Sequence, residues 1–232
     1  MLKAGLRYAS VSLLAISGVV LIGLQIRPLG WIFLALTGMS IFLADQKFIR
    51  NMGLLVISLA ILGFTPINTD ISPSHMTIMA ATLLSAVAVP YCISRYVYGD
   101  YAVRFRFHHG RYWYKSEVAY VLLAGIIAYF LLPFYLKNTG AFLNWPSDAD
   151  PGGLVRLFIG TNALGIWDEL FFVSTVLGIL RQFFPFSWAN LFQATLFTSF
   201  LYELGFTGWG FIMIFLFAFL QGYIFKQTES LF

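Results

Sequence analysis

The chain has 232 residues, of which 59% are hydrophobic and only 10% are charged. Its mean hydropathy is +0.81, a composition that excludes an ordinary soluble enzyme and indicates an all-α integral membrane protein. The formal net charge of +4 indicates no nucleic-acid partner, because the basic residues follow the loops of a membrane protein.

Apolar segments long enough to cross about 30 Å of hydrocarbon as helices recur along the chain, separated by short polar joints. They are continuous and rich in Leu, Ala, Phe and Gly, without the alternation of barrel strands. We therefore predict about eight transmembrane helices in one bundle that covers residues 1–232. The predicted ranges are 8–26, 29–45, 52–68, 76–97, 117–137, 153–181, 186–204 and 207–226.

The joint 137–153 is the clearest internal division, because it gathers the loop-forming residues Asn, Pro, Asp and Gly. Five predicted helices precede it, within residues 1–137, and three follow it, within residues 153–232.

The first apolar segment resembles a signal peptide, because basic residues precede it. It runs on to Ile26 without a small-residue cleavage site, so we expect a retained anchor. With a cytoplasmic N-terminus, every Lys and Arg except Arg27, Lys137 and Arg156 falls on the cytoplasmic side. We predict that both termini are cytoplasmic and that the protein is a multi-pass protein of a bacterial or archaeal plasma membrane.

Cys92 is the single cysteine, which excludes an intramolecular disulfide and a cysteine-based zinc site. The joint 95–117 alternates basic and aromatic residues and contains His108 and His109. We interpret it as an interfacial segment near anionic headgroups. A docking surface for a substrate tail, with pH-sensitive histidines, is the alternative.

Two adjacent acids, Asp168 and Glu169, interrupt the apolar segment 153–181 in the stretch GIWDELFF. One carboxylate in mid-membrane costs about 2.5 to 3.5 kcal/mol, so such residues almost always face a bundle interior or a hydrated cavity. Glu203, in LFTSFLYELGF, is a third acid in the last three predicted helices. We therefore predict that these three residues form the functional site.

At about 100° per residue, Glu169 of a regular α-helix would share a face with Asn162 and Gly165, and with Phe172 and Val173 on the following turn. Whether Glu203 contacts the two adjacent acids depends on how deep each residue lies in the membrane. Asp168 lies well inside its helix and Glu203 near a helix end, an offset of about 15 Å at 1.5 Å per residue. The spacing leaves open whether the three acids converge.

The segments WDELFFV (167–173), FTSFLYELG (197–205) and GYIFKQTESL (222–231) resemble the CPBP intramembrane proteases, which include the CAAX prenyl endopeptidase. That family carries EExxxR on one helix, FxxxH on the next, and His with Asn on a final helix. The resemblance covers roughly residues 153 to 232. It implies a multi-helix membrane enzyme that cleaves a peptide bond with glutamate-activated water.

Asp168 and Glu169 match the paired glutamates of the family pattern, whereas Val173 stands where the pattern has Arg. Glu203 matches the His of FxxxH, and Ser199 replaces its Phe. We expect the chain to lack the final His/Asn helix. The resemblance thus implies a divergent member.

Clustered carboxylates can still bind and deprotonate water, because like charges raise one another's pKa until a proton is shared. The matching positions supply no His, Arg or Asn to stabilise an oxyanion. We consider Asn162, Tyr202 and Gln221 as supporting polar residues in their place. No cofactor is required, although three carboxylates could instead bind a divalent cation.

The resemblance implies an intramembrane endopeptidase acting on a membrane-associated or C-terminally tagged protein. A catalytically inactive relative that binds a peptide or toxin, as an immunity or scaffold protein does, is the first alternative. A proton or cation transporter is the second, although no inverted repeat is visible. A further alternative is that the acids serve packing alone, through hydrogen bonds between helices.

Overall fold

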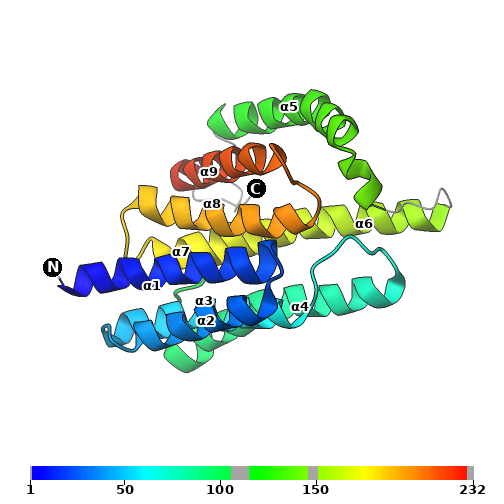
Figure 1. Cartoon of the computed structure of the whole chain (residues 1–232). Coiled ribbons are helices and arrows are strands. Elements are labelled where there is room, and N and C mark those ends of the chain that lie inside the picture. The colour runs from blue at the N-terminus through cyan, green and yellow to red at the C-terminus, as the bar shows by residue number, and fades with distance from the viewer. Residues whose placement is uncertain (1, 106–114, 146–150, 229–232) are drawn as a thin grey trace.

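The computed structural model describes residues 2–105, 115–145 and 151–228, and every regular element in these ranges is helical. Long helices run side by side along one direction (Figure 1). His108 and His109 lie outside the described residues. The predicted all-α class is confirmed.

The α-helices and the shorter π and 3-10 helices (η) are α1 (Leu2–Gly18), η1 (Val19–Gly23), α2 (Arg27–Ile41), α3 (Gln46–Phe64), α4 (Pro73–Cys92), η2 (Ile93–Tyr98), α5 (Lys115–Thr139), η3 (Ala141–Asn144), α6 (Pro151–Asp168), η4 (Glu169–Leu177), α7 (Gly178–Leu180), α8 (Phe186–Glu203) and α9 (Gly210–Thr228).

Among the described residues, six helical segments rather than eight are long and apolar enough to cross a membrane. The predicted spans 29–45 and 186–204 correspond to α2 and α8. α2 has only 15 residues, and α8 carries Asn190, Gln193 and Glu203, which lower its hydropathy. The six are Ala4–Gly23, Gln46–Phe64, Pro73–Tyr98, Val118–Thr139, Pro151–Leu180 and Gly210–Thr228.

Protein surrounds helix α8, which explains how it carries polar side chains inside the bundle. It packs against α1, η1, η4 and α9, and the side chains of Asn190 and Gln193 are fully buried. A polar side chain is tolerated within a bundle when it faces other helices rather than acyl chains. The buried polar side chains of α8 therefore mark it as a central helix.

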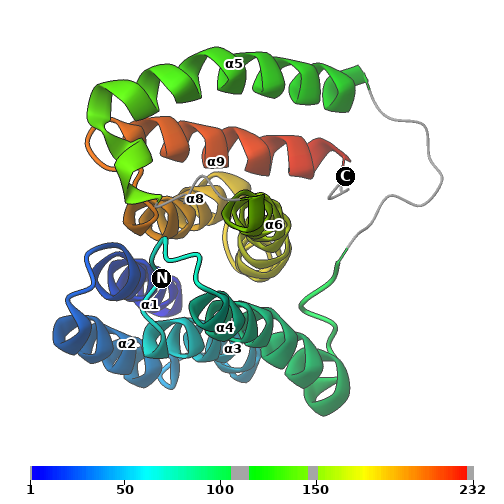
Figure 2. The same cartoon turned by 90° about the vertical axis from the view of Figure 1, so that its right-hand side faces the viewer.

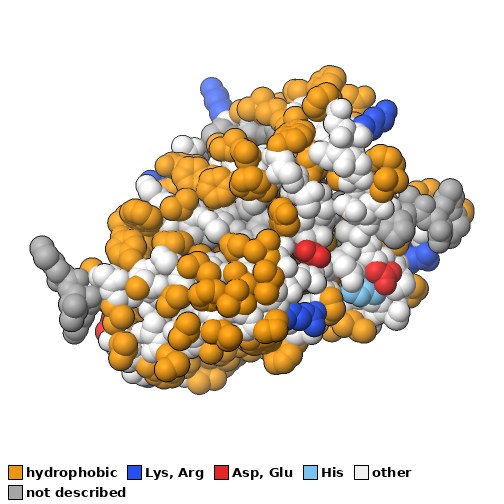
Figure 3. All heavy atoms as spheres, viewed as in Figure 1, with side chains coloured by type: hydrophobic (Ala, Val, Ile, Leu, Met, Phe, Trp, Pro, Cys, Tyr) orange, Lys and Arg blue, Asp and Glu red, His pale blue; other side chains and the backbone are white. Residues whose placement is uncertain are grey.

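The helices form layers. Figure 2 shows α9 between α5 and α8, with α1 to α4 on the far side of α6 and α8. Helix α5 packs mainly on α9 and η3, and only 6% of its most apolar window is buried. Hydrophobic side chains also cover large patches of the face shown in Figure 3. Such a surface suits acyl chains rather than water.

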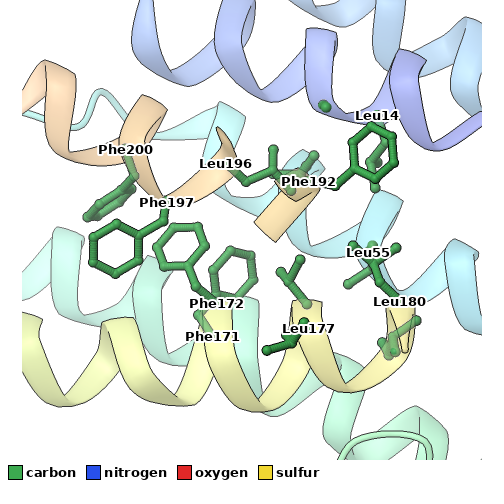
Figure 4. Packing of buried hydrophobic residues seen from close by; sticks show 14 of the residues in the cluster. Leu14, Leu55, Phe171, Phe172, Leu177, Leu180, Phe192, Leu196, Phe197 and Phe200 are labelled. Carbon is green, nitrogen blue, oxygen red and sulfur yellow. The ribbon is translucent and has the colours of Figure 1, made fainter. Parts of the chain in front are cut away.

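Aromatic packing joins the layers at η4. The Phe172 ring lies 5.0 Å from that of Phe197 and 5.9 Å from that of Phe200, centroid to centroid. Trp167 stacks on Phe171 at 4.8 Å. Figure 4 shows these phenylalanines between η4 and α8. Edge-to-face pairs of this kind stabilise by about 0.5 to 1.5 kcal/mol beyond burial, so η4 is held firmly against α8.

Hydrogen bonds between helices fix the remaining contacts. Trp167 Nε1 donates to the Leu83 carbonyl at 2.7 Å and ties α6 to α4. Asn190 Nδ2 donates to the Phe219 carbonyl at 2.8 Å and ties α8 to α9. A Cβ at Gly222 would overlap Asn190 Oδ1, so this glycine lets α9 approach α8 closely.

Candidate functional site

The two adjacent acids lie where a regular α-helix gives way to a π-helix. α6, η4 and α7 form one continuous span, Pro151–Leu180, and Glu169 is the first residue of η4. A π-helix bonds i to i+5 and is often found at functional sites.

The π-helix changes the neighbours of Glu169. Wider turns mean fewer degrees per residue, so Phe172, three residues on, turns away from Glu169 and the predicted shared face with Phe172 does not hold. Phe172 is 1% exposed and packs against α8, whereas the Glu169 carboxylate contacts α9. The error came from applying α-helical rotation to a segment that is not α-helical.

Glu169 is paired with Gln221 of α9. Gln221 Nε2 donates a hydrogen bond to Glu169 Oε1. Gln221 is 7% exposed, and its own Oε1 has no hydrogen-bond partner among the described residues. A hydrogen bond to an ionised acceptor is stronger and shorter than a neutral one. The contact therefore holds the Glu169 carboxyl in one orientation.

Asp168 is buried beside this pair. It is 7% exposed and close enough to Glu169 for their charges to interact. Its Oδ1 accepts no hydrogen bond within the described part of the chain. Leaving a buried acceptor unsatisfied costs about 1 to 3 kcal/mol, so Asp168 presents an oxygen that a water molecule or a polar ligand group would satisfy.

Tyr120 of α5 also approaches Glu169, although no sequence motif selected it. It is half-buried and close enough to Glu169 for the two groups to interact electrostatically. The only signal was a tyrosine in the otherwise aliphatic stretch VAYVLLAG. Its phenol brings a hydroxyl donor from a third helix.

The other predicted residues do not join the cluster. Asn162 is exposed and donates from Nδ2 to the Phe158 carbonyl of its own helix at 2.8 Å. Tyr202 and Glu203 lie half-buried at the end of α8. Within the described ranges, no hydrogen bond or charge interaction joins either of them to Asp168 or Glu169. The structure thus brings together Asp168, Glu169 and Gln221 of the predicted set.

A divalent-cation site has no support from side-chain placement. No three His, Cys, Asp or Glu side chains of the described residues lie close enough together to hold a metal ion. The acids therefore form a pair and not a triad with Glu203.

A mostly apolar cavity of about 270 Å³ lies between α4 and α6, and neither Asp168 nor Glu169 lines it. Trp167, immediately before Asp168, forms part of its wall. Gly160 of α6 and Met76 and Leu83 of α4 form other parts. The cavity offers space for an apolar group against Trp167, the residue before Asp168.

A comparison with known protein families matches the region of the chain that carries this site. Residues 150–232 match the profile of the family described as type II CAAX prenyl endopeptidase Rce1-like. No curated protein and no solved structure matches the chain significantly. The matched region contains Asp168, Glu169 and Gln221. The C-terminal third of the chain thus matches the Rce1-like family, and the resemblance to the CPBP intramembrane proteases is confirmed over these residues.

Proposed function

We propose that the protein is an intramembrane endopeptidase that hydrolyses a peptide bond of a membrane-associated or C-terminally tagged protein. The Glu169 carboxylate, oriented by Gln221 and flanked by the unsatisfied Asp168 oxygen, is the observation that carries the proposal. The Rce1-like match over the same residues supports this class of reaction.

In this mechanism Glu169 acts as general base. It removes a proton from a water molecule whose oxygen attacks the scissile carbonyl carbon. The tetrahedral intermediate then collapses, the C–N bond breaks, and the proton passes from Glu169 to the leaving amine. Asp168 accepts a hydrogen bond from the same water and limits its orientations.

Tyr120 takes the role of hydroxyl donor to the developing oxyanion. The family pattern supplies cationic or amide donors that the matching positions of this chain do not carry. A donor aimed at an oxyanion in a site that excludes water is worth about 2.7 to 4 kcal/mol, or 10² to 10³ in rate. Tyr120→Phe, which removes only the hydroxyl, is therefore expected to lower kcat within that range.

The apolar cavity beside Trp167 accommodates the hydrophobic part of the substrate. Its volume of about 270 Å³ and its apolar walls match a lipid-like or aliphatic group better than a charged one. A prenylated peptide is the substrate named by the family description, and it is the first probe to use.

The test is cleavage of a quenched fluorescent peptide that ends in a prenylated cysteine followed by three residues, with the full chain in lipid nanodiscs. Glu169→Gln is expected to abolish cleavage, and Asp168→Asn to reduce it strongly. Glu203→Gln makes the same chemical change outside the acid pair and is expected to retain cleavage.

Binding of the same peptide distinguishes the enzyme from an inactive relative. Val173 at the position of the family Arg and Glu203 at the position of its His favour that second reading. Tight binding without cleavage by the wild-type chain, unchanged in Glu169→Gln, would support a peptide-binding protein in place of the enzyme.

A further inference from the structure

A second, polar cavity lies at the opposite end of η4 from Glu169. Its volume is about 320 Å³. Ser174 and Gly178 form its floor, and Arg104, Arg181 and Asp100 are the charged residues of its wall. This cavity is separate from the apolar one beside Trp167, and the proposed hydrolysis makes no use of it.

Neither arginine of the cavity is neutralised by an acid of the described residues, although Arg104 lies over the Tyr101 ring and Arg181 over the Phe186 ring. Arg7–Asp45 is the salt bridge found among the described residues, and neither Arg104 nor Arg181 has an acidic partner there. Arg104 uses only Nε, which donates to the Tyr101 carbonyl at 2.9 Å. The terminal nitrogens of both guanidinium groups therefore remain available as donors.

Ser174 supplies an independent indication of a ligand. It is 2% exposed, it lines the cavity, and its Oγ has no hydrogen-bond partner within the described residues. A buried hydroxyl without a partner is rare in native proteins. An oxygen acceptor bound in the cavity would satisfy it.

The wall favours an anion over a cation. Two arginines against the single Asp100 leave one net positive charge. Asp100 Oδ1 is already occupied, because it accepts hydrogen bonds from Ser94 Oγ at 2.9 Å and from the Ala102 N–H at 3.1 Å. These hydrogen bonds within its own loop partly compensate the negative charge of Asp100.

The C-terminal end of α7 lies beside the cavity, and its partial negative charge would repel an anion only weakly. The Arg181 N–H donates to the Leu177 carbonyl at 2.9 Å, and the Gln182 N–H donates to the Ile179 carbonyl at 3.1 Å. These bonds satisfy carbonyls that would otherwise face the cavity. Arg181 itself balances the negative end of the helix dipole.

The height of the cavity in the bundle indicates the source of the anion. The membrane spans Pro73–Tyr98, Pro151–Leu180 and Gly210–Thr228 all end within a few residues of its wall. Lipid phosphates lie where membrane spans end, and basic pockets between helices bind acidic headgroups at that level.

We propose that this cavity binds a phosphate oxyanion, held by the guanidinium groups of Arg104 and Arg181 and by the Ser174 hydroxyl. Arginine binds phosphate through parallel N–H···O bonds, and the serine hydroxyl donates a third. The phosphate belongs either to the headgroup of an acidic lipid or to a small soluble phosphate, and both have the same binding chemistry.

Two measurements on the full chain in detergent separate these sources. Native mass spectrometry counts retained phosphatidylglycerol, with phosphatidylcholine as the reference lipid. Thermal unfolding compares inorganic phosphate with chloride at equal ionic strength. Retention of phosphatidylglycerol alone identifies a lipid site, stabilisation by phosphate alone identifies a soluble ligand, and both together identify a site open to either.

The variants decide whether this cavity is the place of binding. Arg181→Gln and Ser174→Ala are each expected to weaken the retained interaction about tenfold, the effect of losing one hydrogen bond to a charged oxygen. Ser174→Ala removes an unpartnered hydroxyl, so the fold is expected to remain intact even if Arg181→Gln fails to fold. Arg95→Gln removes an equal charge from an exposed residue near the same end of the bundle and is the matched control.

Glu169→Gln is expected to keep full phosphate binding, so failure of the proposed hydrolysis and failure of this site are distinguishable. Absence of both phosphatidylglycerol retention and phosphate stabilisation would overturn the proposal. Binding that Ser174→Ala and Arg104→Gln leave at wild-type strength would overturn it as well.

Discussion

Replacement of Gln221 by methionine tests whether the contact between α9 and η4 serves the chemistry. Gln221 Nε2 donates to Glu169 Oε1, and methionine keeps a similar length without a donor. If Glu169 is the general base, the variant leaves the base in place but removes the group that orients it. We expect a lower kcat with little change in KM.

The size of the effect follows from the lost bond. A hydrogen bond to a charged group is worth about 1.5 to 3 kcal/mol, and each 1.36 kcal/mol is a factor of about ten in rate. The expected fall in kcat is therefore about ten- to a hundredfold. The free energy of unfolding should change little. The same substitution also removes the buried Gln221 Oε1, and leaving such an acceptor without a partner costs about 1 to 3 kcal/mol.

The assay is steady-state cleavage of the quenched prenyl peptide in nanodiscs, with thermal unfolding measured in parallel. Gln227→Met is the matched control, because Gln227 lies on the same helix but is exposed. A Gln221→Met variant with wild-type kcat would refute the orienting role. A variant with lower kcat and a melting temperature lowered to match would indicate a packing role only.

Two further changes test other parts of the structure. Gly160→Leu fills the apolar cavity, where a Cβ at Gly160 would already lie 3.5 Å from Met76 Cε. We expect at least a tenfold higher KM for the prenyl peptide, because burying a leucine-sized group is worth about 1.5 to 3 kcal/mol. Gly165→Leu on the same helix, where a Cβ meets nothing within 4 Å, should leave KM unchanged, and equal KM values in both variants would contradict the assignment. The hydrogen bond from Arg7 holds the pKa of Asp45 below its ordinary value of 3.8, so the stabilisation is present above that value and is lost as the pH falls through the lowered pKa. Because both side chains are about a third exposed, Asp45→Asn should cost no more than about 0.5 kcal/mol at neutral pH. The melting-temperature difference from the wild-type chain should disappear in strong acid and shrink in high salt, and a difference that persists at pH 2 would contradict this account.

The sequence by itself determined the class of protein and the positions of the acids. Length and hydropathy are local properties, so the span predicted at 153–181 corresponds to Pro151–Leu180 and the helix predicted at 186–204 to α8. The cost of burying carboxylates selected Asp168 and Glu169, and the family pattern around them agrees with the Rce1-like match.

Only the tertiary structure decided which side chains meet. The α-helical rotation assumed for Glu169 fails because a π-helix begins at that residue. Glu203 stays apart from the acid pair, in line with its different depth, whereas Gln221 and Tyr120 arrive from α9 and α5. Sequence spacing fixes the neighbours within one regular helix, but contacts between helices depend on their relative depth, rotation and separation. Those quantities follow from the packing of the whole bundle.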